Sequence, residues 1–209
     1  MDHFASKPTA TRDGRSPDSV GPVRPAGTLP PPPRRTTWTL QQNITRLLWS
    51  TLGRFAWVLL PPLRSELIRL FGGTVGRNCA FARSVDIIIP WNLHVGDNVQ
   101  VGEKVILYAL GIIKMGNNVV IDYKAHLCAG THDMNDPRFA LLTPPITIGA
   151  GCFIGIDAYI GPGVTLGDNC RVWPRASVYK SQAQGVILRG NPARPVTDLA
   201  SSDEARAPA

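Results

Sequence analysis

The chain lacks the marks of a secreted or membrane-spanning protein. No apolar core follows the first residues (1–15), so we expect no secretory signal. Arg46, Arg54 and Arg64 interrupt the apolar runs of residues 38–71, which stay shorter than the roughly 20 residues that cross a bilayer. The four cysteines include no CxxC pair, which predicts free thiols in a reducing compartment. Together these absences predict a cytoplasmic protein.

Acidic residues are scarce only in the first third of the chain. Residues 1–74 hold ten Lys or Arg against four Asp or Glu, whereas residues 75–180 hold nine against eight and residues 181–209 three against three. The formal net charge of +7 is therefore a property of the N-terminal part. This distribution argues against nucleic-acid binding by the main domain and leaves an acidic membrane surface as a candidate partner of the N-terminal part.

A repeat of six residues organises the chain between residues 146 and 178. An aliphatic residue returns at every sixth position: Ile148, Ile154, Ile160, Leu166, Val172 and Val178. A glycine follows each of the first four. A helix repeats about every 3.6 residues and a strand every two, so neither explains this period. A hexapeptide repeat is typical of a parallel β-helix, here with three short strands per rung that close a triangular coil.

The repeat also predicts which residues stack. Residues that are three hexads apart should lie one above the other at about 4.8 Å, the usual distance between strands. Ile148 should then lie against Leu166. Cys152 and Cys170 have the same spacing, and we expect them to be small core residues without a disulfide. The glycines should lie at turns that need a positive φ or a close approach of two backbones.

The same period runs through the earlier part of the chain but is interrupted. Its phase changes at residues 88–93 and again at residues 108–114, where we expect bulges or short loops. Leu127 and Ile148 are 21 residues apart, which is not a multiple of six. Residues 131–145 must therefore leave the coil as a loop.

The segments beside the coil have a different character. Residues 29–35 contain four consecutive prolines, which exclude a helix, and residues 38–71 show a helical apolar face that Pro61 and Pro62 interrupt. We therefore divide the chain into a disordered Pro-rich tail (1–37), a helical segment (38–73), a β-helix domain (74–180) with its loop (131–145), and a C-terminal extension (181–209).

Two interpretations of the helical segment are open. Trp38, Trp49 and Trp57 alternate with arginines, a pattern that suits a helix lying in a membrane interface. The alternative is that the helices pack on the body of the protein. The two interpretations are compatible with each other.

Histidine is rare, which narrows the candidates for acid–base chemistry. The four histidines are His3, His94, His126 and His132. His132 stands at the mouth of the predicted loop, where a rigid coil would hold it, and an unperturbed imidazole has a pKa near neutrality. Asp133, Asn135 and Asp136 follow it and could orient it or bind hydroxyl groups. A surface histidine without a chemical role is the alternative.

Three histidines in the coil also raise the hypothesis of a zinc site, because zinc sites use clustered histidines. The γ-class carbonic anhydrases share the hexapeptide coil and bind zinc between subunits. The spacing of His94, His126 and His132 does not match their pair of histidines five residues apart. We therefore expect no metal.

Three features together resemble a known family. The hexads, the loop sequence GTHDMNDPRF (residues 130–139) and the sequence GNPAR (residues 190–194) resemble the left-handed β-helix acyltransferases. Within that family the chain most resembles the sugar O-acetyltransferases of colanic acid biosynthesis, nodulation, and galactoside or maltose acetylation, and residues 70–93 resemble the colanic acid type. The resemblance implies a homotrimer with active sites between adjacent coils. It also implies acetyl-CoA as cosubstrate, a saccharide or lipid-linked saccharide as acceptor, and transfer without an acyl-enzyme.

The same resemblance implies roles for individual residues. His132 corresponds to the general base, and Asn92 resembles an acceptor-binding asparagine. The positions that correspond to contacts with coenzyme A are Phe153, Ile156, Pro174, Tyr179, Lys180 and Arg194. The chain departs from the subgroup in having Thr131 where a serine is common and Phe153 where a tryptophan is common. Its loop is also shorter than in the galactoside type.

Three functions thus enter as hypotheses. The first is an acetyl-CoA-dependent O-acetyltransferase of cell-surface polysaccharide synthesis, which the basic helices would place at the inner face of a membrane. The second is an N-acetyltransferase of an amino sugar that uses the same base. The third is a trimeric β-helix without catalytic activity.

Overall fold

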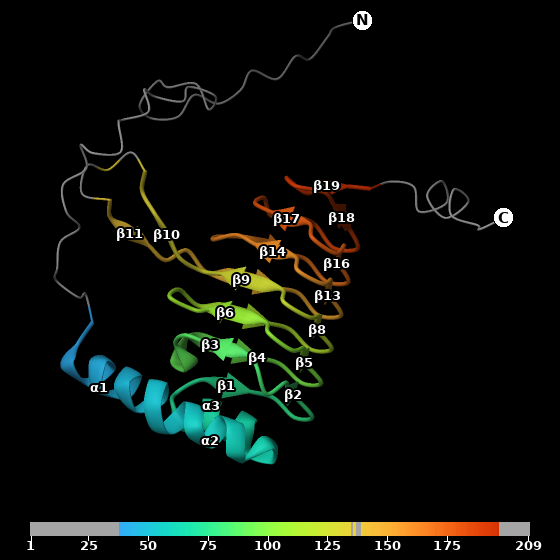
Figure 1. Ribbon diagram of the computed structural model, residues 1–209. Coiled ribbons are helices and arrows are strands. Elements are labelled where there is room, and N and C mark those ends of the chain that lie inside the picture. The colour runs from blue at the N-terminus through green and yellow to red at the C-terminus, as the bar shows by residue number, and fades with distance from the viewer. Residues whose placement is uncertain (1–37, 135, 137–138, 197–209) are drawn as a thin grey trace, which may run out of the picture.

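A three-sided parallel coil with a helical cap makes up the structure (Figure 1). This computed structural model describes residues 38–134, 136 and 139–196. The tail 1–37, for which the sequence predicts disorder, and the last residues, 197–209, lie outside the described part. The coil confirms the predicted parallel β-helix, and it is preceded by the predicted helical segment.

Each side of the coil is a narrow parallel sheet. Face A contains β1 (Thr74–Val75), β4 (Leu93–Val95), β7 (Ile113–Met115), β12 (Ile146–Ile148) and β15 (Thr165–Leu166). Face B contains β2 (Ala80–Phe81), β5 (Gln100–Val101), β8 (Val120–Ile121), β13 (Phe153–Ile154), β16 (Arg171–Val172) and β18 (Ile187–Arg189), with β19 (Arg194–Pro195) added antiparallel. Face C contains β3 (Asp86–Ile87), β6 (Ile106–Tyr108), β9 (His126–Cys128), β14 (Tyr159–Ile160) and β17 (Ser177–Val178).

The register follows from the hexad. Ile148 pairs with Leu166, as the spacing of 18 predicts. Earlier in the chain, Val75 pairs with Val95 and Val95 with Met115, so these rungs contain two more residues. The residue at the hexad position of each parallel coil strand is buried, and these side chains form one continuous core. Burial of each such side chain contributes about 1.5–3 kcal/mol, which makes the interior stack the main source of stability.

Two kinds of residue form the edges of the coil. Gly149 and Gly167 do not have a positive φ. They are needed for close approach, because a Cβ on Gly149 would lie 2.5 Å from the backbone nitrogen of Asp168. Asparagine is the commonest non-glycine residue with a positive φ, at Asn78, Asn98, Asn118 and Asn169, and the Asn78 amide donates to Asn98 at 3.2 Å. Asparagine tolerates this backbone region better than other non-glycine residues, so it can fill these positions in successive rungs.

The two core cysteines behave as small apolar residues. Cys152 and Cys170 are buried and free, as predicted. The Cys152 thiol donates to the carbonyl oxygen of Gly167 at 3.1 Å. Burial raises the pKa of this thiol to about 11, because a thiolate would lose its hydration. Cys152 is therefore an unreactive part of the core.

The helical segment covers the first rung of the coil. It consists of α1 (Leu40–Leu48), the π-helical turn η1 (Trp49–Gly53), α2 (Arg54–Leu59), the 3₁₀ turn η2 (Pro61–Leu63) and α3 (Arg64–Leu70). Thr39 caps α1, accepting a hydrogen bond from the backbone of Gln42, whose side chain accepts one from the Thr39 nitrogen in return. Within the described residues, no helix has the length and apolar character needed to cross a bilayer.

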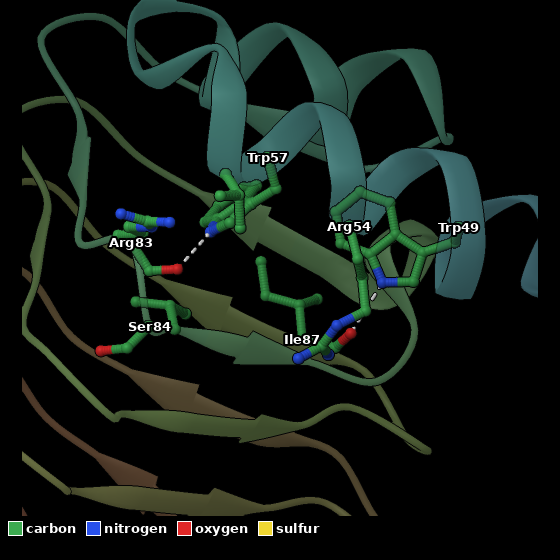
Figure 2. A pocket seen from close by; sticks show the side chains of 8 residues that line it. Trp49, Arg54, Trp57, Arg83, Ser84 and Ile87 are labelled. Carbon is green, nitrogen blue, oxygen red and sulfur yellow. Dashed lines mark hydrogen bonds between the residues drawn. The ribbon is translucent and has the colours of Figure 1, made fainter.

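Two tryptophans fasten this cap to the coil. Trp49 is 3% exposed and donates its indole N–H to the carbonyl oxygen of Ile87 at 2.7 Å, and Trp57 is 4% exposed and donates to Arg83 at 3.1 Å. Figure 2 shows both indole nitrogens directed at these coil carbonyls, beside a small pocket. Arg64 adds a hydrogen bond of 2.7 Å to the carbonyl oxygen of Phe81. Trp49 and Trp57 therefore belong to the packing of the cap, and assigning them to a membrane interface is wrong.

The close approach at the edges gives a stability prediction. Gly149→Ala should lower the free energy of unfolding by about 3 kcal/mol, because the new methyl group overlaps backbone atoms that cannot move without disturbing the next rung. The measurement is urea denaturation followed by circular dichroism.

Gly185→Ala is the matched control. Gly185 has a φ of 72° but no neighbouring atom within 4 Å of the position of a Cβ. Its replacement should cost only the strain of a left-handed alanine, about 1 kcal/mol. Equal losses in the two variants would mean that close approach does not limit these edges.

Candidate active site

All departures from the hexad lie along one edge of the coil, where the chain passes from face C to face A. We call this the C–A edge. It contains the 3₁₀ turn η3 (Pro90–Asn92), which follows β3, and the turn at residues 109–112, which follows β6. The excursion at residues 131–145 follows β9. The two phase changes and the loop expected from the sequence are thus stacked above one another.

The excursion is a hairpin built on the turn below it. Its strands are β10 (Thr131–His132) and β11 (Leu141–Leu142), which pair antiparallel and project from the side of the coil (Figure 1). The backbone nitrogen of Gly111 donates to the carbonyl oxygen of Ala129 at 2.7 Å. A Cβ on Gly111 would lie 2.4 Å from the carbonyl oxygen of Thr143, so only glycine allows the base of the hairpin to pack this closely. The hairpin therefore starts from a fixed base.

His132 is held in one orientation by Phe139. The His132 Nδ1 atom lies 2.8 Å from the carbonyl oxygen of Phe139, and the two rings stack with centroids 4.5 Å apart and planes 9° apart. A carbonyl only accepts, so in the neutral imidazole Nδ1 carries the proton and the lone pair is on Nε2. His132 is exposed on the hairpin. The arrangement presents an oriented base to a ligand outside the coil.

The polar residues after His132 lie in the tip of the hairpin. The backbone nitrogen of Asp133 donates to Ala140 at 2.9 Å, and the carbonyl oxygen of Asp136 accepts from Phe139 at 2.8 Å. Both aspartates are half-buried. Asn135, the third residue predicted to bind hydroxyl groups, lies outside the described residues. The group found at His132 Nδ1 is the Phe139 carbonyl, which sequence reasoning missed because a backbone atom leaves no trace in residue type.

Asn92 lies on the same edge as the hairpin, but its amide is used inside the chain. The Nδ2 atom donates to the carbonyl oxygens of Ala109 and Leu110, both at 2.9 Å. Both Nδ2 hydrogens are therefore used within the chain, and only the Oδ1 atom remains for a hydrogen bond with a substrate hydroxyl group. The Asn92 side chain thus stabilises the turn at residues 109–112.

The residues predicted to contact coenzyme A are divided between different parts of one chain. Tyr179 and Lys180 lie on the C–A edge after β17, above the hairpin. Ile156 and Pro174 are exposed on the other end of face C, where the chain enters it from face B. Phe153 is half-buried on face B itself. A single chain therefore does not bring these residues to one place around His132.

Arg194 completes the predicted set at the last rung. It is exposed in β19, opposite Arg189 of β18. Arg189 in turn lies over the ring of Trp173 at 5.0 Å. This end of face B thus carries positive charge on exposed side chains, a suitable chemistry for phosphate groups.

The other coil histidines do not join His132. His94 lies on face A, with Nδ1 2.9 Å from the Thr74 hydroxyl. His126 lies on face C between Tyr108 and Tyr159, and burial lowers its pKa because the charged form would be poorly hydrated. Among the residues that the structure describes, no group of three or more His, Cys, Asp or Glu is placed to hold a metal ion.

Comparison with known proteins places this geometry in a family. The family model for bacterial transferase hexapeptide (six repeats) matches residues 145–180. A protein of Escherichia coli K12 provisionally named colanic acid biosynthesis acetyltransferase WcaF is 41% identical over 156 residues, which cover 75% of this chain and 81% of that protein.

Two solved structures share the fold. A galactoside acetyltransferase in complex with coenzyme A has a TM-score of 0.67 and 24% identity, and the alignment covers 81% of this chain and 88% of that one. A hexapeptide-repeat acetyltransferase of Vibrio cholerae complexed with acetyl coenzyme A has a TM-score of 0.70 and 21% identity, covering 77% and 90%. Together with the identity to WcaF over most of both chains, the hexapeptide coil shows that this chain belongs to the hexapeptide-repeat acetyltransferase family.

Proposed function

We propose that the protein transfers an acetyl group from acetyl-CoA to a hydroxyl group of a saccharide, in the synthesis of a cell-surface polysaccharide. The observation that carries the proposal is the orientation of His132 by the Phe139 carbonyl on an exposed hairpin. The similarity to WcaF, whose name refers to colanic acid biosynthesis, supports the class of acceptor.

His132 would act as the general base. Its Nε2 lone pair accepts the proton of the acceptor hydroxyl while the hydroxyl oxygen attacks the thioester carbon of acetyl-CoA. The Nδ1–H bond to Phe139 remains in place and stabilises the imidazolium that forms. When the intermediate collapses, the carbon–sulfur bond breaks, the coenzyme A thiolate leaves and takes the proton, and the acetyl ester is the product. Transfer is direct, so no cysteine or serine nucleophile is required.

The residues available for acetyl-CoA suit its chemistry. Tyr179 and Ile156 offer exposed apolar surface to a long thioester arm, and Lys180 and Arg194 offer positive charge to its phosphate groups. They do not surround His132 within one chain, because they lie on two edges and at the last rung. A homotrimer would bring the C–A edge of one copy against another face of its neighbour. Because no single chain gathers His132 and the residues expected to bind acetyl-CoA in one place, a complete site requires more than one copy, which supports the proposed trimer.

His132→Ala should reduce acetyl transfer by about a hundredfold or more, because the proton of the hydroxyl would lose its acceptor. Turnover is measured by release of coenzyme A, and binding of coenzyme A is measured by calorimetry. His94→Ala is the matched control, since His94 lies on face A, and it should retain full turnover. Undiminished turnover in His132→Ala would rule out this residue as the base.

The stacking of Phe139 on His132 gives a second prediction. Phe139→Ala keeps the backbone carbonyl but removes the ring contact, so kcat should fall about tenfold or more with little change in KM for acetyl-CoA. Phe139→Tyr retains the ring and should restore kcat. If the tyrosine variant is as slow as the alanine variant, the stacked ring does not position His132.

The class of acceptor is tested with pairs of sugars that differ only in a hydroxyl or an amino group at one position. We expect acetyl ester formation on the hydroxyl acceptors, detected by mass spectrometry, since a neutral hydroxyl needs a base at neutral pH. A panel of cell-envelope saccharide intermediates, including lipid-linked forms, provides the acceptors. Exclusive formation of amides would instead identify an N-acetyltransferase.

A further inference from the structure

The helical cap has a second apolar face, directed away from the coil. Trp49, Gly53 and Trp57 form the face that is buried on the coil. The opposite side of α1, η1 and α2 exposes an outer face made of Leu40, Ile44, Leu47, Leu48, Leu52, Phe55, Val58 and Leu59. Leu40 is 77% exposed, Leu52 65% and Phe55 68%. A contiguous apolar surface of this kind marks an interaction site.

The charge around the outer face indicates the kind of partner. From Trp38 to Ser65 the chain contains three arginines and no Asp or Glu. Arg64 donates to the coil and Arg54 forms an ion pair with Asp86 of β3, whereas the guanidinium of Arg46 lies over the Trp38 ring at 4.0 Å. The preceding residues, 1–37, add six Lys or Arg against three Asp or Glu. The partner should therefore offer an apolar region for the outer face and negative charge around that region for the basic residues.

We propose that this outer face docks onto the surface of a bilayer that contains anionic phospholipid. A short helix with one apolar face and arginines beside it lies in the plane of the membrane interface, its leucines among the acyl chains and its guanidinium groups among the phosphates. Among the described residues no helix is both long and apolar enough to cross a bilayer, and the contact that we propose is peripheral.

A second copy of the chain fits this surface less well. A symmetric contact through the outer face would bring Arg46 of one copy toward the basic segment of another. Residues 38–65 supply no acidic side chain to compensate it, and Asp86 is already paired with Arg54. An anionic bilayer surface suits both features, because its acyl chains can bury the apolar side chains and its phosphate groups can pair with the arginines.

The position of the cap relative to the hairpin determines where a docked protein would hold its active site. In Figure 1 the cap lies at the end of the coil, and α1 extends beyond it on the side from which β10 and β11 project. A docked protein would thus act on acceptors at or near a membrane. That consequence rests on the proposed function, whereas docking itself does not.

The test is flotation of the full-length protein with lipid vesicles. We expect the protein to float with vesicles of phosphatidylglycerol and phosphatidylcholine. With vesicles of phosphatidylcholine alone it should remain in the bottom fraction of the gradient. Leu52→Glu/Phe55→Glu should reduce the floated fraction about tenfold or more, because carboxylates replace the inserted side chains. Leu40→Glu, at the start of α1, gives an independent variant and should also reduce it.

The matched control is Gln100→Glu/Gln184→Glu, which adds the same two charges to exposed positions of the coil. It should float nearly as well as the unchanged protein. Failure of the unchanged protein to float with anionic vesicles would overturn the inference, as would full flotation of Leu52→Glu/Phe55→Glu.

Two further measurements distinguish lipid docking from self-association and from catalysis. If Leu52→Glu/Phe55→Glu dissociates the oligomer in lipid-free buffer, as seen by light scattering, the outer face joins copies of the chain and the lipid inference is wrong. His132→Ala should float normally while losing acetyl transfer, and Leu52→Glu/Phe55→Glu should keep acetyl transfer to a soluble sugar. Docking and catalysis can therefore fail independently.

Discussion

The stack of aliphatic side chains inside the coil is the constraint on which the rest of the structure depends. Backbone hydrogen bonds set the distance between rungs, and the hexad residue of each coil strand is buried in the narrow interior. A strand therefore cannot gain or lose a residue without turning its core residue outward. Close packing at the edges adds a second restriction, since Gly149 meets the backbone of the next rung. Variation is possible only where the chain turns.

In this chain the variation lies at one of the three edges. The extra residues of both 20-residue rungs and the hairpin are all inserted at the C–A edge, whereas the other two edges keep the six-residue spacing throughout the described coil. Stacking the departures lets each one support the next: Asn92 holds the 109–112 turn, and Gly111 receives the base of the hairpin. The excursion that carries His132 is thus supported by two smaller ones below it.

The sequence predicted the features that depend on side-chain type and spacing, and missed those that depend on backbone atoms or on choosing between two surfaces. The register of Ile148 and Leu166 follows from counting. The orientation of His132 depends on a carbonyl oxygen, which every residue has, so no pattern distinguishes Phe139. The cap is apolar on two opposite sides, and periodicity alone does not tell which side holds the coil. The buried indole of Trp49 answers that question.

The three described histidines explain why a base has to leave the coil. On face A, His94 contacts the Thr74 hydroxyl of the adjacent strand. On face C, His126 is packed between aromatic rings, and its Nε2 atom is buried without a hydrogen-bond partner in the described part of the chain. Burial lowers the pKa of His126 and also shields the nitrogen from any ligand. A flat, closely stacked face therefore makes a poor site for proton transfer. The hairpin frees His132 from this packing, while the Phe139 carbonyl restores the fixed orientation that a strand of the coil would have given.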